Sequence, residues 1–470
     1  MPMDMQSVLT WVAKASYFVA TLLFILGIKR MSSPVTARRG IVQAGIGMVL
    51  ATLATFAITG AHNVGLIVLG IAVGVVPTWL WGKKVAMTDM PQMVALFNGM
   101  GGGSAAAIGA GELIKFAHAG AAPPMSTLAF AVIGALIGSI SMTGSIIAWA
   151  KLDGRMDKRF TFGGQQAFNF LVFAGALACG LALVFWQVGT PLVVAFFVLA
   201  LAFGVLMTLP IGGADMPVVI SLFNAFTGLA VAFEGYVMQI EALIVAGMVV
   251  GAAGTLLTQL MAKAMNRPIS GVLFSNFGGG GSSAEIAGSQ KPIEAPDAAS
   301  LLYMAEKVII VPGYGMAVAQ AQHKIWELSQ ALIKAGKEVR FAIHPVAGRM
   351  PGHMNVLLAE AGVPYDLIAD MDDINPEFKT CDVAIVIGAN DVVNPSAKTD
   401  KSSPIFGMPI LDVVDSRQVI VIKRGKGTGF AGIENALFYA DNCRLLYADG
   451  KEAASRLIAE LKGIESGGGH

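Results

Sequence analysis

The first 262 residues of the chain are almost continuously apolar, and only short polar loops interrupt them. Each apolar run is close to the roughly 20 residues that a helix needs to cross a bilayer. The pattern predicts nine membrane-spanning helices, at about 8–28, 40–60, 64–81, 91–113, 126–150, 166–187, 190–209, 216–237 and 238–262. Residues 1–262 are therefore expected to form a polytopic α-helical membrane bundle.

The rest of the chain has a different pattern. Residues 298–465 alternate short apolar runs with amphipathic stretches, which is typical of a soluble α/β domain. Residues 263–297 contain a Gly/Ser-rich stretch and are expected to be a linker. Residues 466–470 read Ser-Gly-Gly-Gly-His and are expected to be a disordered tail.

Composition supports this division. The chain is 55% hydrophobic and only 13% charged, whereas soluble domains carry about 25% charged residues. The values argue against a disordered or a wholly soluble protein. The net charge of +1 gives no reason to expect a nucleic-acid partner. Cys179, Cys381 and Cys443 lie far apart, so neither a disulfide framework nor a metal site is expected.

Loop charges predict the orientation of the bundle. Twelve Lys and Arg residues lie in the loops after the first, third and fifth spans and at the end of the ninth. The alternate loops contain only Lys115. Cytoplasmic loops are enriched in Lys and Arg, so the N-terminus is expected outside and the C-terminal domain in the cytoplasm.

A glycine motif opens the α/β domain. A buried-strand pattern at 307–311 runs into Gly313-x-Gly315-x-x-Val318, and a helix is expected to start there and continue through 322. Glycines at such a turn let the backbone approach a pyrophosphate, although Val318 replaces the usual third Gly or Ala. Further strands are predicted at 338–343, 365–368, 383–387 and 419–422. Strands that alternate with helices predict a Rossmann-like domain with a parallel, doubly wound sheet.

The residues that follow the strands favour NADP over NAD. An NAD site usually has an acidic residue after the second strand, but this chain has His344 and Pro345 there. Three cations among glycines follow the fifth strand, in Lys423-Arg424-Gly425-Lys426-Gly427-Thr428-Gly429. Such a loop suits a phosphate monoester, although a solvated basic turn is the alternative. Arg349 could meet the pyrophosphate or be an ordinary surface residue.

Several long stretches closely resemble the β subunits of bacterial proton-translocating NAD(P) transhydrogenases. They are residues 87–91, 211–219, 313–322, 344–360, 388–395 and 407–409. The resemblance extends over essentially the whole chain. It implies a membrane domain followed by an NADP(H)-binding domain, and an enzyme of the Si-Re-specific type.

The resemblance also implies the reaction and the partners. Hydride would pass from NADH to NADP+, and this transfer would be coupled to inward proton movement across a bacterial inner membrane. NAD(H) would be bound by a partner α subunit that also carries extra membrane helices, and the assembly would be a dimer of heteromers in the lipid bilayer. No metal is implied.

Site residues are implied by the same resemblance. Tyr314 lies in the glycine turn, Asp391 links nucleotide state to protonation, and the loop through Phe430 acts as a lid. Around the nucleotide lie Val346, Ala347, Gly348, Arg349, Met350, Pro351, Gly388, Ala389, Asn390, Val392, Gly407 and Met408. Lys423 and Arg424 hold the 2′-phosphate, and Asp449 and Gly450 match less well. NADP(H) is expected to lie reversed relative to ordinary Rossmann enzymes.

Polar residues within the spans are candidates for a proton path, because they are costly there. Many relatives have a histidine where this chain has Asn98, and an amide does not carry protons near neutral pH. Asn98 and Asn224 are expected either to bind waters or to hold helices together. In the first case the titrating group comes from a partner's helix. Asp215 could sense the position of the soluble domain or be a simple turn residue.

Two acidic residues, Glu112 and Glu234, are close to the outer ends of their spans, where solvation at the interface is expected to explain them. Two other functions remain open at this point. The chain could be a membrane transporter with a regulatory NADP-binding domain, or a non-enzymatic anchor for a soluble dehydrogenase.

Overall fold

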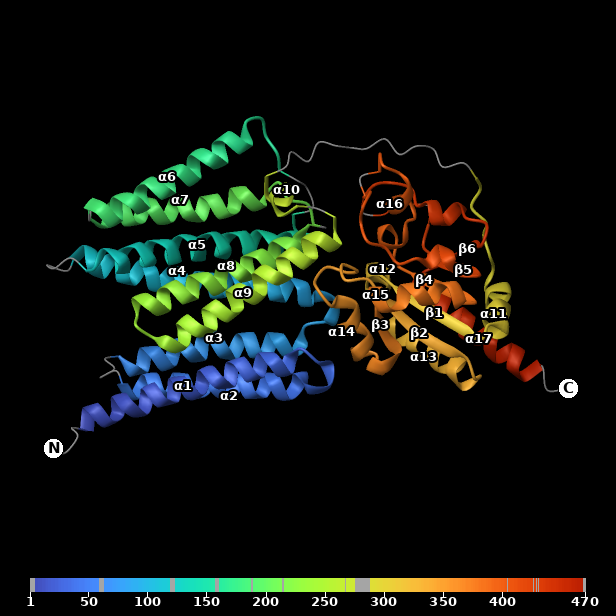
Figure 1. The fold of residues 1–470 in the computed structure, drawn as a ribbon, viewed down its shortest axis with the longest axis horizontal. Helices are drawn as coiled ribbons and strands as arrows, with labels where there is room; N and C mark the ends of the chain where they lie inside the picture. The colour runs from blue at the N-terminus through green and yellow to red at the C-terminus, as the bar shows by residue number, and fades with distance from the viewer. Residues whose placement is uncertain are drawn as a thin grey trace. The chain divides into compact units, whose positions relative to one another are not determined.

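We describe the protein from a computed structural model (Figure 1). It describes residues 5–58, 63–118, 123–156, 160–186, 189–213, 215–266, 268–274, 288–403, 405–425, 427, 429 and 431–467. The chain divides into two compact units. The first comprises residues 1–213 and 219–258, and the second comprises residues 214–218 and 259–470.

The first unit is a bundle of long apolar helices. Within the described residues, nine helices are long and apolar enough to cross a membrane, which confirms the nine predicted spans. They are α1 (Met5–Met31), α2 (Pro34–Ile58), α3 (Val64–Lys84), α4 (Met90–His118), α5 (Met125–Leu152), α6 (Gln165–Trp186), α7 (Thr190–Thr208), α8 (Met216–Val237) and α9 (Glu241–Ala264). The chain is thus a multi-pass membrane protein.

Small residues bring helices α4, α5, α8 and α9 close together. A Cβ atom added at Gly102 of α4 would lie 2.9 Å from the carbonyl oxygen of Gly138 in α5. One added at Gly228 of α8 would lie 2.5 Å from the amide nitrogen of Gly251 in α9. These contacts use van der Waals packing and not hydrophobic burial, which is the usual basis of helix association in a bilayer.

The second unit contains a parallel sheet, as predicted, and the sheet has six strands. Its strands are β1 (Lys307–Pro312), β2 (Glu338–Ile343), β3 (Ile368–Asp370), β4 (Val383–Ile387), β5 (Gln418–Lys423) and β6 (Cys443–Tyr447). The order is β3-β2-β1-β4-β5-β6, so the chain reverses direction across the sheet between β1 and β4. Ligands of such sheets bind at the carboxyl ends of the strands near this reversal.

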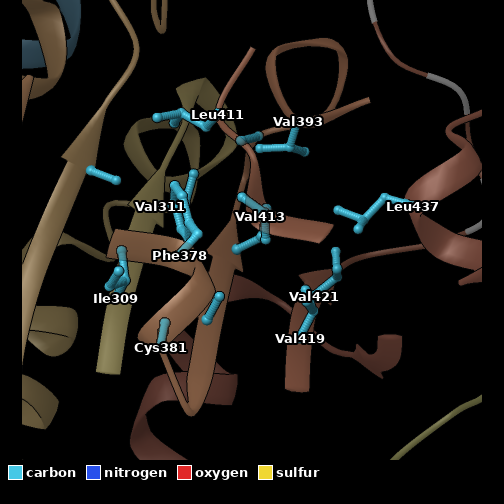
Figure 2. Packing of buried hydrophobic residues seen from close by; sticks show 14 of the residues in the cluster. Ile309, Val311, Phe378, Cys381, Val393, Leu411, Val413, Val419, Val421 and Leu437 are labelled. Atoms are coloured by element: carbon cyan, nitrogen blue, oxygen red, sulfur yellow. The ribbon is translucent and has the colours of Figure 1, made fainter. Parts of the chain in front are cut away.

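Alternation along the strands gives each face of the sheet its own core. On one face, Ile309 and Val311 of β1 pack with Val419 and Val421 of β5 and with Phe378 (Figure 2). The helices of this unit are α10 (Ile269–Phe274), α11 (Ala295–Met304), α12 (Tyr314–Val318), α13 (Gln322–Lys334), α14 (His353–Glu360), α15 (Met371–Ile374), α16 (Ser396–Thr399) and α17 (Gly450–Gly467). Among them, α17 packs against both α11 and α13.

The structure differs from the sequence prediction in four places. Helix α10 occupies 269–274 within the range expected to be a linker, and residues 275–287, which hold the Gly/Ser-rich stretch, lie outside the described residues. Helix α17 continues to Gly467, into the expected tail, and residues 468–470 lie outside the described part. The third strand begins at Ile368 because a 3-10 turn occupies 365–367. Strand β6 was not predicted.

Candidate functional site

The predicted nucleotide-binding residues converge on one edge of the sheet. All six strands are parallel, so the residues that follow β1, β2, β4, β5 and β6 meet at the carboxyl edge. These segments are 313–315, 344–351, 388–392, 424–425 and 448–450. The site residues predicted for the soluble domain after strands of the sheet therefore share this edge.

The glycines after β1 and β4 interlock. The amide of Gly313 donates to the carbonyl of Ile387 at 2.8 Å, and that of Gly315 donates to the carbonyl of Gly388 at 2.9 Å. A Cβ atom on Gly315 would lie 2.7 Å from the Cα atom of Gly388. The space beside these glycines is filled by protein backbone. Their first role is thus to let two loops touch, whereas the motif was expected to make room for a pyrophosphate.

The helix expected through 322 is divided. Helix α12 ends at Val318, Gln320 adopts a left-handed backbone conformation with φ of 48°, and α13 begins at Gln322. Val318, the variant third position of the motif, is 46% exposed. A five-residue helix has little macrodipole, so the long helix N-terminus of an ordinary dinucleotide site is absent from this loop.

His344 joins two loops and takes the place of the acid expected in an NAD site. Its Nδ1 accepts from the Val346 amide at 3.2 Å, so Nε2 carries the proton and donates to the carbonyl of Pro409 at 2.8 Å. The side chain is 1% exposed, and burial lowers the pKa of His344 to about 4. The imidazole is therefore neutral at pH 7. The bond also fixes the loop that contains Gly407 and Met408.

Arg349, Tyr314 and His353 lie together beside this loop. The guanidinium of Arg349 lies over the Tyr314 ring, 4.5 Å from its centroid, and the Tyr314 and His353 rings are 6.2 Å apart. The Arg349 amide donates to Nδ1 of His353 at 3.1 Å. Gly348 has φ of 115°, a conformation that favours glycine. The half-buried segment 346–351 therefore brings a cation next to the glycine turn.

Asn390 and Asp391 are held by the chain that follows β5. Asp391 accepts from the Ala431 amide at 2.8 Å, and Asn435 donates to the carbonyl of Asn390 at 2.9 Å. Asn394, 0% exposed, donates to the carbonyl of Glu434 at 3.1 Å. No local pattern in the sequence marks Asn394 or Asn435 as a contact between these segments. Only the sheet order shows that these polar residues, about 40 positions apart, face each other.

Cations dominate the end of β5. Lys423 is half-buried, with its amine 4.4 Å from the centroid of the Phe438 ring, and burial lowers its pKa from the usual value. Arg424, Gly425 and Gly427 are exposed. Gly429 contacts Asn390 and Asp391. The expected site residues Lys426, Thr428 and Phe430 lie outside the described residues.

Asp449 and Gly450 follow β6 beside these cations. The Ala448 amide donates to the carbonyl of Lys423 at 3.1 Å, so the two loops are adjacent. The Asp449 carboxylate accepts from the Lys451 amide at 3.0 Å at the start of α17. A Cβ on Gly450 would lie 3.2 Å from Ile387. Asp449 thus has a structural role at a helix start in addition to its expected place near the nucleotide.

The carboxyl edge fits NADP(H) in its chemistry. Arg349, Lys423 and Arg424 provide cations at the ends of two strands, and a neutral histidine replaces the acid that would repel a 2′-phosphate. The described residues contain no group of three or more His, Cys, Asp or Glu side chains that could hold a metal ion.

In the membrane bundle, a second polar cluster joins α4, α5 and α8. Asn98 donates to the hydroxyl of Ser145 at 2.9 Å and to that of Ser141 at 3.4 Å. The Ser141 and Thr227 hydroxyls are 2.6 Å apart, and Ser141 also donates to the carbonyl of Phe223 at 2.9 Å. Asn98 thus holds two helices together, one of the two roles that the sequence left open.

The other residues proposed for the proton path lie elsewhere. Asn224 follows Phe223 and is half-buried. Asp215 is 2% exposed and directly precedes α8. The expectation that Glu234 is solvated at the end of its span is wrong, because its side chain is 1% exposed. Small residues on the neighbouring helices allow Glu234 to be buried. The hydropathy of α8 alone cannot show this, because it contains no information on the helices that pack against it.

Comparisons with known proteins agree with this geometry. A family model described as NAD(P) transhydrogenase beta subunit matches residues 13–460. The NAD(P) transhydrogenase subunit beta of Rhodospirillum rubrum is 45% identical over 463 residues, which cover 95% of this chain and 98% of the relative. The protein of the same name from one particular strain of that species has the same identity and coverage.

Proposed function

This chain belongs to the NAD(P) transhydrogenase β-subunit family. We therefore propose that it binds NADP(H), and that it couples hydride transfer from NADH to NADP+ with inward proton movement. The observation that carries the proposal is the carboxyl edge of the sheet, where cations follow β2 and β5 and a neutral His344 stands where an NAD site has an acid.

In this proposal, each part of the edge has a task. Lys423 and Arg424 bind the 2′-phosphate, and Arg349, oriented by the Tyr314 ring, binds a phosphate of the same nucleotide. The interlocked loops at Gly313 and Gly388 orient the ligand and exclude water. The bound nicotinamide supplies the hydride chemistry itself. The side chains therefore serve to position the nucleotide.

Asp391 is proposed to link nucleotide binding to protonation. Its carboxylate accepts from the Ala431 amide, and Ala431 follows the basic loop directly. Any movement of that loop would change the hydrogen bonding of Asp391. This contact is what supports a role for Asp391 in coupling.

We further propose the setting of the reaction. A partner α subunit holds NAD(H) and contributes additional membrane helices, and two such heteromers associate in a bacterial inner membrane. The excess of Lys and Arg in alternate loops supports a cytoplasmic C-terminal domain.

The test has a direct readout. The chain, assembled with its partner in sealed vesicles, is given deuterium-labelled NADH and NADP+. Deuterium is expected in NADPH together with a change of internal pH. A transporter or an anchor would leave NADP+ unlabelled, and that result would contradict the proposal.

Nucleotide preference is tested by Arg424→Gln and Lys423→Gln. Each is expected to weaken NADP+ binding by roughly 10-fold or more, because a hydrogen bond to a charged group contributes about 1.5–3 kcal/mol. Binding of NADP+ relative to NAD+ is measured by calorimetry, and Arg417→Gln, at an ion pair with Asp382, is the control. If the unchanged protein bound NAD+ as tightly as NADP+, the assignment would be wrong.

A further inference from the structure

Glu234 of α8 is buried without a hydrogen-bonding partner. Its side chain is 1% exposed, and neither carboxyl oxygen has a partner within the part of the chain that the structure describes. Glu112 of α4 is different, because its carboxylate pairs with Lys115 at 3.4 Å and keeps 24% of its side-chain surface. Buried charges in proteins are usually paired, so Glu234 calls for a functional reason.

Two glycines make room for the carboxyl group. A Cβ atom added at Gly109 of α4 or at Gly134 of α5 would lie 2.6 Å from Oε1 of Glu234. The rings of Phe130 and Phe233 stack with their centroids 5.6 Å apart, and Phe233 lies beside Gly134. The carboxyl group is thus directed between two helices and not toward the bundle surface.

Glu234 lies on the same face of α8 as Thr227, which belongs to the polar cluster of Asn98, Ser141, Ser145 and Thr227. On α8 it is seven residues from Thr227, which is two helical turns or about 10 Å. On α5 the facing Gly134 is likewise seven residues from Ser141. Between them, Gly102 and Gly138 bring α4 and α5 into backbone contact. The interface between α4, α5 and α8, the seam, therefore holds the hydroxyl and amide cluster at one level. The carboxyl group of Glu234 lies in the same seam, two helical turns away.

We propose that Glu234 is a proton-binding group of the membrane domain, and this inference rests on the proposed function. An O–H bond forms when the carboxylate takes a proton from water on one side, and it breaks when the proton passes to water that reaches the polar cluster. No electrons move. In the closed seam the neutral form is retained because an ionised, unpaired carboxylate is costly there. The titrating group is then supplied by this chain and not by a partner's helix.

The groups that face Glu234 determine how it responds to pH. Glu112 of α4 interacts with it electrostatically, and Lys115 accompanies Glu112. Helix α5 has no ionisable side chain before Lys151, and α9 begins with Glu241. On α8 itself, the phenol of Tyr236 lies two residues away. Protonation of Glu234 is therefore expected to depend on the charge of Glu112.

The experiment uses the complete complex in sealed vesicles. Glu234→Gln is expected to lower proton movement per hydride by roughly 100-fold, the lower end of what a positioned proton-transfer group contributes. It should also remove one protonated-carboxyl band from the infrared spectrum. Glu234→Asp should retain proton movement and shift the band. Asp153→Asn, at an acid of the same bundle that pairs with Arg155 away from Glu234, is the control and should pump within a factor of about two of the unchanged complex.

The outcomes separate two failures. If the unchanged complex transfers hydride without moving protons, the proposed function fails. If it pumps and Glu234→Gln pumps equally well with its infrared bands unchanged, only the role of Glu234 is wrong. Should Glu234→Gln not assemble, Glu234→Asp decides, because an unshifted carboxyl band would overturn the assignment.

Discussion

Glycine is abundant in both halves of this protein, but the two halves use it differently. In the bundle, Gly228 and Gly251 are helical and let two helices approach. In the sheet domain, Gly388 has φ of 70° and joins the loop after β4 to the loop after β1. Two helices can relieve a steric clash by separating by a few tenths of an ångström. The strain of a side chain at a left-handed backbone position lies in the residue itself, so moving the two loops apart does not relieve it. Substitutions in the two regions should therefore differ in cost.

Buried polar groups show a second difference. In the sheet domain, His344 is fixed by hydrogen bonds to two loops, and Asn435 donates to Asn390. In the bundle, Asn98 is hydrogen-bonded, whereas neither carboxyl oxygen of Glu234 has a partner among the residues that the structure describes. The sheet domain uses polar residues to hold a binding edge in one shape. The bundle retains a buried carboxyl group, for which we propose a role in binding a proton.

The largest effect is expected for Gly388→Ala. A left-handed alanine costs about 1–2 kcal/mol, and its Cβ would collide with the Gly315 and Met316 backbone. Overpacking of this kind adds about 1–3 kcal/mol. We expect faster hydrogen exchange at β1 and β4 amides in the full chain, measured by mass spectrometry.

Two other glycine variants serve as controls for Gly388→Ala. Gly463→Ala, on the exposed part of α17 with no atom within 4 Å, should leave exchange unchanged or slightly slower. Gly228→Ala should cost less than Gly388→Ala, because α8 and α9 can separate. Equal effects of Gly388→Ala and Gly463→Ala would contradict the account of the interlocked loops.

A smaller effect concerns pH. The pKa of His344 is about 4 in the folded protein and about 6.5 when unfolded, so the unfolded state binds more protons between these values. Stability is thus complete above pH 6.5 and falls as pH approaches 4. From pH 6.5 to 5 the loss is about 1.5 kcal/mol, because the slope reaches 1.36 kcal/mol per pH unit only well below pH 6.5. Protection factors of the amides at 338–347, which are corrected for the pH dependence of intrinsic exchange, should fall accordingly.

His344→Gln tests this assignment. The variant is expected to be less stable at pH 7, because one of the two hydrogen bonds is lost, but its stability should change less between pH 6.5 and 5. His323→Gln, at an exposed position of α13, should retain the pH dependence of the unchanged protein. An unaltered pH dependence in His344→Gln would assign the effect to another group.

The sequence predicted the elements better than their contacts. Hydropathy is a local property, so all nine spans and five of six strands could be found from runs of apolar residues. Strand β6 was missed because Cys443-Arg444-Leu445-Leu446 is short and interrupted by a charge. The division of α12 from α13 depends on the left-handed Gln320, which no glycine or proline signals.

The residues of the candidate site were predicted, but the contacts that hold them together were not. The motif at Gly313 was found, yet the contact that explains it lies 75 residues away at Gly388. Asn435 pairs with Asn390 only because β4 and β5 are neighbours. The burial of Glu234 depends on glycines of two other helices. Long-range placement of this kind cannot be read from local patterns.

The smallest effect is expected within the bundle, at the Asn98–Ser145 hydrogen bond. In the membrane-embedded unfolded state these groups find other partners, so such bonds contribute only about 0.6 kcal/mol on average. A double-mutant cycle with Asn98→Ala and Ser145→Ala should give a coupling energy of that size, from unfolding in mixed micelles. Asn224→Ala combined with Ser145→Ala is the control pair and should be additive. A coupling above about 2 kcal/mol would exceed the usual range for hydrogen bonds between membrane helices and would contradict this expectation.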